Sequence, residues 1–219
     1  MSDTAAFQDF AGRSLRLDTL VRLRWLAVAG QTATVLFVHF YLGFPLPLTL
    51  CLALTALSAL LNVALRLRYP SSLRVGSVAG SLLLGYDVLQ LGGLLYLTGG
   101  LDTPFSLLLP VPVVVSATTL APRPTMILSL LVVAVASGLG LVHQPLPWYP
   151  GGALTVPSVY SGGVWVALVS TCAFTGVYTF RVADEARQLA KALAATELVL
   201  AREQHLSALD GLAAAAAHE

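Results

Sequence analysis

The segment VGSVAGSLLLGYDVLQLGGLLYLT, residues 75–98, decides the fold class of this chain. It carries a single charged residue, Asp87. A helix of about 20 apolar residues crosses a hydrocarbon layer of about 30 Å, so this segment predicts a membrane-spanning helix. The whole 219-residue sequence has the same character, being 57% hydrophobic and 11% charged. Because a soluble domain carries about 25% charged residues, the composition argues against a water-soluble globular protein.

Five further apolar stretches flank this segment and are separated from it by Gly, Pro and Ser. The six predicted spans are Trp25–Leu42, Pro47–Leu65, Val75–Thr98, Phe105–Leu120, Thr125–Val142 and Val159–Phe180. Pro110 and Pro112 lie inside the fourth span and are predicted to kink it. The sequence therefore predicts an all-α membrane protein whose six-span sensor domain covers residues 25–180.

The basic residues lie on one side of the predicted bundle. They precede the first span, separate the second from the third and the fourth from the fifth, and follow the sixth. An excess of Lys and Arg marks cytoplasmic loops, so both termini are predicted to be cytoplasmic. Residues 1–24 are then a cytoplasmic lead-in rather than a signal peptide. The net charge of +1 is too small to suggest a nucleic-acid partner.

Residues 181–219 are predicted to form a cytoplasmic helix that follows the last span. Apolar or small residues recur there with the 4-3-4-3-4 spacing of a coiled-coil seam, at Val182, Ala186, Leu189, Leu193, Thr196 and Leu200. An amphipathic helix lying on the bilayer is the alternative. The polar face mixes acids with bases, and this favours a dimeric coiled coil.

Asp87 is the only ionisable residue deep inside a predicted span. Such residues usually face the bundle interior, because a charge in lipid is costly. Asp87 could bind a quinone oxygen or relay protons, or it could be a structural acid bonded to Gln31 or to a backbone carbonyl. Gln31, on the first span, could face inward beside it.

The residue types of the segment GGLDTPF, residues 99–105, predict a tight turn between two helices. Gly99 and Gly100 can end the third span in left-handed conformations. Thr103 can cap the fourth span, with Pro104 at its first helical position. From spacing alone, a tight turn without further function explains these residues.

His218 and Glu219 end the sequence. An imidazole there could attack the γ-phosphate of ATP while the adjacent acid accepts a proton, with charge stabilisation from a nucleotide-binding domain. A lone His-Glu dipeptide is weak support by itself. Cys51 and Cys172 lie far apart inside apolar runs, and no metal site can be assembled from the sequence.

Three segments together resemble the RegB/PrrB/ActS family of redox-sensing histidine kinases. They are the start of the first span (RLRWLAVAGQ, residues 22–31), the turn Gly99–Phe105 with its continuation into the fourth span, and the approach to the terminal histidine (residues 203–219). The turn resembles the family's quinone-associated heptapeptide at Gly99, Gly100, Pro104 and Phe105. Thr103 stands where the family has Asn, which keeps a capping hydroxyl but loses an amide donor.

The resemblance implies a sensor that reads the redox state of the ubiquinone pool in a bacterial inner membrane. The quinone turn would comprise Gly99, Gly100, Asp102, Thr103, Pro104 and Phe105. A parallel homodimer would carry the signal to His218, which would be phosphorylated and pass the phosphoryl group to a response regulator.

By the same resemblance, ATP and Mg²⁺ would act through a domain that is absent here, so we expect the chain alone to be inactive. A different class of protein, a small multi-span transporter or quinone-binding scaffold without kinase activity, would explain the apolar bundle and Asp87. It would leave the coiled-coil pattern and His218 unexplained.

Overall fold

The computed structural model describes residues 17–70, 76–149, 154 and 156–216, with the backbone alone described at 197–199 and 201–216. The chain divides into two compact units, Met1–Thr179 and Phe180–Glu219. Helices and turns make up the described part, which contains no strand. The all-α fold predicted from the sequence is therefore confirmed.

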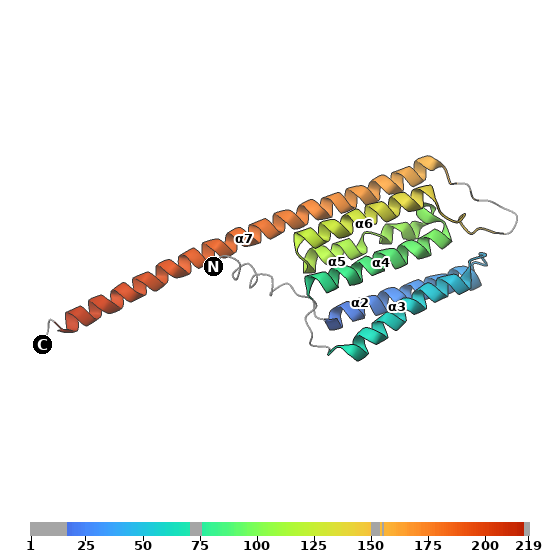
Figure 1. Ribbon diagram of the computed structural model, residues 1–219. Helices are drawn as coiled ribbons and strands as arrows, with labels where there is room; N and C mark the ends of the chain where they lie inside the picture. Colours follow the sequence, from blue (N-terminus) through green and yellow to red (C-terminus); the bar gives the residue numbers. More distant parts are fainter. Residues whose placement is uncertain (1–16, 71–75, 150–153, 155, 217–219) are drawn as a thin grey trace. The chain divides into compact units, whose positions relative to one another are not determined.

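Six α-helices and three shorter helical turns follow one another along the described chain (Figure 1). They are α2 (Leu17–Leu36), the π-helical turn η2 (Phe37–Tyr41), α3 (Leu48–Arg68), α4 (Ser77–Thr98), the 3₁₀ turns η3 (Gly100–Asp102) and η4 (Pro104–Leu108), α5 (Val111–Thr119), α6 (Pro122–Leu141) and α7 (Ser158–Ala216).

Four of the described helices are long and apolar enough to cross a membrane: α3, α4, α6 and the Ser158–Thr196 part of α7. Large apolar side chains point away from the protein on each of them, such as Leu60, Leu82, Ile127 and Phe174. Such extensive apolar surface is unfavourable in water and is expected where lipid covers it. The chain is therefore a membrane-bound protein.

The first predicted span differs from the prediction at its beginning. Helix α2 begins at Leu17, eight residues before Trp25, so part of the expected lead-in is helical. Its first two turns carry Asp18, Arg22 and Arg24, and α2 is not among the four helices apolar enough to span.

The fourth predicted span is not one helix. The 3₁₀ turn η4 covers Pro104–Leu108, and the nine-residue helix α5 begins only at Val111. Pro110 precedes α5 and Pro112 lies in its first turn, where a missing N–H leaves no hydrogen bond unmade. The two prolines thus set the beginning of a short helix instead of kinking a long one.

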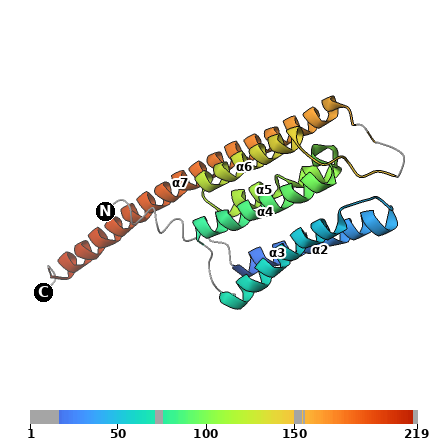
Figure 2. The same ribbon diagram turned by 45° about the vertical axis from the view of Figure 1, so that its right-hand side comes forward.

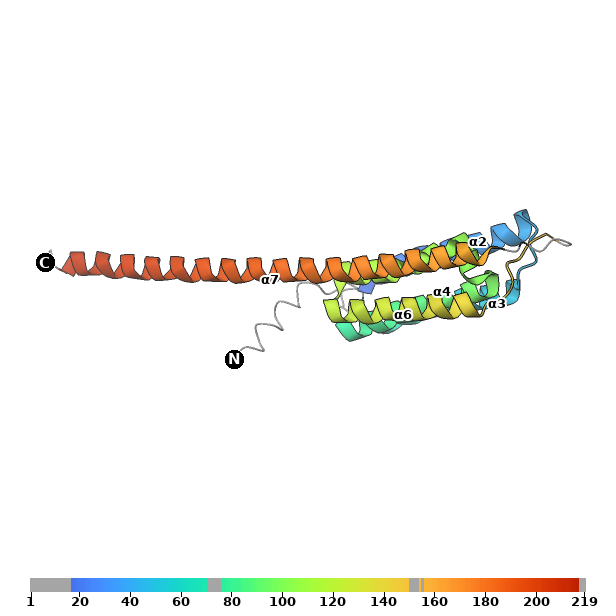
Figure 3. The same cartoon turned by 90° about the horizontal axis from the view of Figure 1, so that it is seen from above.

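The apolar core lies among α4, α5, α6 and the first part of α7. Val88, Val113, Val132 and Leu168, one from each helix, are almost fully buried in it. Figure 3 shows α4 and α6 side by side in one layer, with the first part of α7 in another. Helices α4 and α5 of this core also line the site described below.

Helices α2 and α3 form a pair beside this core (Figure 2). The buried face of α3 is partly polar, with Cys51, Thr55, Ser58 and Asn62 at helical spacing, and Asn62 donates to the Val21 carbonyl of α2. Small side chains let two helix backbones approach closely in a membrane.

Candidate functional site

The turn after α4 is built from two left-handed glycines, as the sequence predicts. Gly99 has φ +111° and ends α4, and Gly100 has φ +60°. A Cβ on Gly100 would lie 2.6 Å from Cγ of His143, and a Cβ on Gly99 would lie 3.0 Å from Cα of Leu146. Glycine is therefore required at both positions for two reasons: the backbone φ is positive, and the segment that contains His143 and Leu146 leaves no room for a Cβ.

Thr103 caps the following turn, also as predicted. Its hydroxyl accepts a hydrogen bond from the backbone N–H of Phe105 at 3.4 Å, and Pro104 occupies the first helical position of η4. The helix that Thr103 caps is the short 3₁₀ turn rather than a full span. Ser106 is fully buried and donates to the Thr103 carbonyl at 2.8 Å, which closes the turn.

Asp102 ties this turn to two other parts of the chain. Its carboxylate accepts a hydrogen bond from the hydroxyl of Ser161 on α7. Nε2 of His143 lies 3.9 Å from the other carboxylate oxygen. The sequence gave no reason to select Ser161, because the contact joins residues 59 positions apart.

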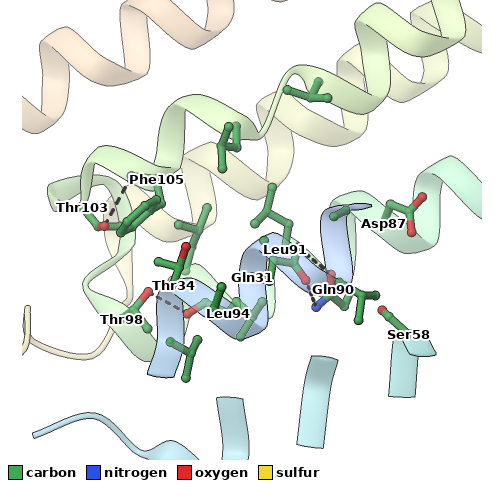
Figure 4. Close-up of a pocket in the computed structure, with 18 of the residues that line it drawn as sticks. Gln31, Thr34, Ser58, Asp87, Gln90, Leu91, Leu94, Thr98, Thr103 and Phe105 are labelled. Atoms are coloured by element: carbon green, nitrogen blue, oxygen red, sulfur yellow. Dashed lines mark hydrogen bonds between the residues drawn. The ribbon is translucent and has the colours of Figure 1, made fainter. Parts of the chain in front are cut away.

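A large apolar cavity of about 1140 Å³ opens beside the turn. Thr103, Pro104 and Phe105 form part of its wall, together with side chains from α2, α4, α5 and the loop before α7. Figure 4 shows Thr103 and Phe105 at one end of this cavity and Asp87 and Ser58 at the other. Cavities of this kind, mostly apolar with a few polar groups, are typical of small-molecule sites.

Asp87 lines the cavity and forms an ion pair with Arg24. The distance from Nη2 of Arg24 to Oδ1 of Asp87 is 3.1 Å, and Arg24 is only 4% exposed. The guanidinium also lies over the ring of Tyr86, 5.2 Å from its centre. Of the two alternatives that the sequence left open for Asp87, the bond to Gln31 or to a backbone carbonyl is replaced by this ion pair with Arg24, which belongs to α2.

Gln31 lines the cavity two helical turns further along α2, and its partner is Gln90. The two side-chain amides exchange hydrogen bonds of 3.3 and 3.1 Å. Figure 4 shows this pair between the two ends of the cavity. Arg24 and Gln31 are seven positions apart on α2, and Asp87 and Gln90 are three positions apart on α4. Each pair therefore lies on one face of its helix, and the two faces meet.

His218 and Glu219 lie outside the described residues. Within the described part, no cluster of His, Cys, Asp and Glu side chains could hold a metal ion. Cys51 and Cys172 are both buried with free thiols, and they belong to different apolar clusters.

Sequence reasoning missed Arg24, Gln90 and Trp148 as members of the site. Arg24 was counted among the basic residues that precede the first span, and Trp148 was given no role in the site. Trp148 in fact lines the cavity and packs against Phe44, with 5.1 Å between ring centres. One feature of the sequence could have identified Arg24 as a member of the site. Arg24 is seven positions from Gln31, so both lie on one face of a helix.

The fold and the cavity define a membrane-bound helical protein with a site of ligand size. Over 212 residues, or 97% of the chain, the sequence is 41% identical to the sensor histidine kinase RegB of Cereibacter sphaeroides. The RegB of strain ATCC 17023 of that organism matches to the same extent. The match covers 46% of each of these proteins, so the chain spans about half the length of the curated relatives it matches.

No family model matches the sequence, and no solved structure does. The identity to RegB nonetheless extends over almost the whole chain. This similarity confirms the resemblance to the RegB family of sensor histidine kinases that the motifs predicted.

Proposed function

We propose that the chain is the sensor part of a two-component histidine kinase that responds to redox state through ubiquinone. The observation that carries this proposal is the position of the 99–105 turn. Thr103, Pro104 and Phe105 form a wall of the apolar cavity. A turn with no role beyond connecting helices has no need to line a cavity of this size.

The chemistry of the cavity suits a quinone with an apolar tail. Aliphatic side chains make up most of the lining, and Phe105 and Trp148 offer aromatic surface at one end. At the other end Asp87 and Gln31 stand beside Arg24 and Gln90, where oxygen atoms of a head group can find polar partners. Gly99, Gly100 and Asp102 hold the turn in shape without lining the cavity.

Asp102 offers a route from the cavity to the rest of the kinase. Its hydrogen bond to Ser161 joins the turn directly to α7, whose range includes the predicted coiled-coil seam. A ligand changes such an equilibrium only through different affinities for two states. We propose that oxidised and reduced ubiquinone favour different packings of α7 at this contact.

The output would be phosphoryl transfer in the full-length kinase. His218 would attack the γ-phosphorus of ATP and displace ADP, with Glu219 accepting the imidazole proton, and the phosphoryl group would then pass from His218 to an aspartate of a response regulator. ATP and Mg²⁺ would bind a nucleotide-binding domain outside the matched region. Positioning and charge stabilisation by that domain would supply most of the catalysis.

The proposed setting is a bacterial inner membrane with both termini in the cytoplasm. Arg66 and Arg68 end α3, and Arg123 lies in the first turn of α6, in accordance with basic residues at the cytoplasmic side. The seam residues Val182, Leu189, Leu193 and Leu200 are exposed in the single chain. A parallel homodimer would cover them as a coiled coil.

Binding of ubiquinone to the purified chain in lipid nanodiscs tests the proposal. Trp148 is the reporter, because it lines the cavity, and Trp25 and Trp165 are replaced by Phe. We expect saturable quenching that the double variant Pro104→Ala, Phe105→Ala loses. Quenching that rises without saturation, equally in both proteins, would mean partitioning into lipid and would remove the support for a quinone site. The alternative function, a transporter or scaffold, would also bind quinone. It is distinguished by the full-length protein, in which quinone would then leave the rate of autophosphorylation unchanged.

A further inference from the structure

The end of the cavity opposite the turn holds a buried cation with unused hydrogen-bond donors. Arg24 lines the cavity at 4% exposure. Its Nη2 forms the 3.1 Å ion pair with Asp87 without hydrogen-bond geometry, and Nε and Nη1 have no acceptor among the residues that the structure describes. Buried N–H groups without acceptors are costly, more so on a charged group. An oxygen-bearing molecule in the cavity would satisfy them.

Most other polar side chains around the cavity are engaged with protein partners, and Thr34 and Trp148, both part of the lining, are the exceptions among the described residues. Gln31 and Gln90 bond to each other, and the hydroxyl of Ser58 lies 3.2 Å from that of Tyr86. At the other end, the hydroxyl of Thr98 donates to the carbonyl of Leu94 at 2.9 Å. The capping hydroxyl of Thr103 is engaged as well. Among the described residues that line the cavity, the fully buried donors without a hydrogen-bond partner are therefore those of Arg24.

The charge balance at Arg24 selects the kind of acceptor. Asp87 lies 3.1 Å away and offsets the positive charge, and the ring of Tyr86 covers one face of the guanidinium. A phosphate or carboxylate would bring an uncompensated negative charge next to Asp87 in a medium of low dielectric constant. A neutral carbonyl oxygen brings none and still accepts the free N–H groups.

We propose that Arg24 determines specificity for the oxidised form of the quinone, by donating hydrogen bonds to one of its carbonyl oxygens. This inference rests on the proposed quinone function. A guanidinium donates only and is always protonated, so it favours the stronger acceptor, which is the carbonyl of the quinone rather than the hydroxyl of the quinol. The carboxylate of Asp87 accepts only and is the natural partner of a quinol hydroxyl. The neighbouring Arg24 and Asp87 thus distinguish the two redox forms.

The proposal can be tested with a short-chain ubiquinone and its quinol, bound separately to the whole chain in nanodiscs. Arg24→Lys keeps the positive charge beside Asp87 but removes the forked donors. We expect it to weaken binding of the oxidised form by about ten-fold or more, as for a charged hydrogen bond, and binding of the quinol by much less. Arg22→Lys is the matched control, because Arg22 is on the same helix, 76% exposed and away from the cavity.

Infrared spectroscopy gives a readout in the unmodified protein that does not depend on the folding of a variant. We expect the carbonyl band of bound ubiquinone to shift downward relative to the same quinone in empty nanodiscs, and Arg24→Lys to reduce the shift. Saturable binding with no carbonyl shift, or with equal affinities in the wild type and Arg24→Lys, would overturn the role of Arg24 and leave the quinone site standing. No saturable binding by the wild type would overturn both.

Discussion

At the scale of single residues, the turn after α4 depends on Gly100 more than on any polar contact. Gly100 adopts φ +60° and lies against the His143 ring. We expect Gly100→Ala to lower the free energy of unfolding by about 1–3 kcal/mol, because an L-residue is strained there and its Cβ displaces His143. Denaturant unfolding in detergent, followed by circular dichroism, measures this loss.

Gly138→Ala on α6 is the matched control for that substitution. Nothing lies within 4 Å of the Cβ that it would add. In a helix interior, Ala is more favourable than Gly by up to about 1 kcal/mol, so stability should stay equal or rise. Equal effects of the two substitutions would contradict the packing of His143 over the turn.

The cap at Thr103 provides a second residue-scale prediction. Thr103→Ala removes the acceptor for the Phe105 N–H and should cost about 1 kcal/mol of stability. Thr103→Asn keeps a capping oxygen and restores the amide of the resembled family, so its stability should match the wild type. Ubiquinone titration of both variants shows whether this amide also matters for affinity.

At the scale of elements, Asp102 and Ser161 join the turn to α7 by one charge-assisted hydrogen bond. We expect Asp102→Asn and Ser161→Ala to destabilise the protein singly, and the double variant to lose less than the sum, with a coupling energy of about 1–3 kcal/mol. A double-mutant cycle in detergent measures it. Strictly additive losses would show that the turn and α7 are energetically independent.

Local features of these elements could be predicted from the sequence, and contacts between elements could not. Gly99, Gly100 and Thr103 were assigned correctly because left-handed dihedrals and capping depend on neighbouring residues alone. The helix opposite Asp87 was predicted through Gln31, but the partner Arg24 was missed because it was assigned to the basic flank before the span, whereas α2 begins at Leu17. Pro110 and Pro112 were interpreted as a kink, since the sequence does not show how short α5 is.

At the scale of the whole molecule, the exposed seam of residues 182–200 predicts self-association. With Cys51 and Cys172 replaced by Ser, we expect Leu189→Cys to cross-link two copies under mild oxidation in native membranes. Leu189 lies on the seam and is 71% exposed in the single chain. A parallel coiled coil would bring the two copies of residue 189 together.

Lys191→Cys is the control for cross-linking, because residue 191 lies on the outer face of the same heptad. It should cross-link far less than Leu189→Cys at equal expression. Cross-linking of both to the same extent would indicate random collision, and cross-linking of neither would favour a helix that lies on the bilayer.

Two polar pairs, Arg24–Asp87 and Gln31–Gln90, join α2 to α4. Contacts between apolar side chains weaken gradually when two helices slide past each other. Hydrogen bonds, in contrast, lose most of their strength over a small change in distance and angle. In lipid no water replaces a broken bond, so intermediate separations of the two helices are unfavourable. The cavity should therefore have two widths, closed and open, with a sharp transition between them. A bound molecule would shift the equilibrium toward the width that it fits better.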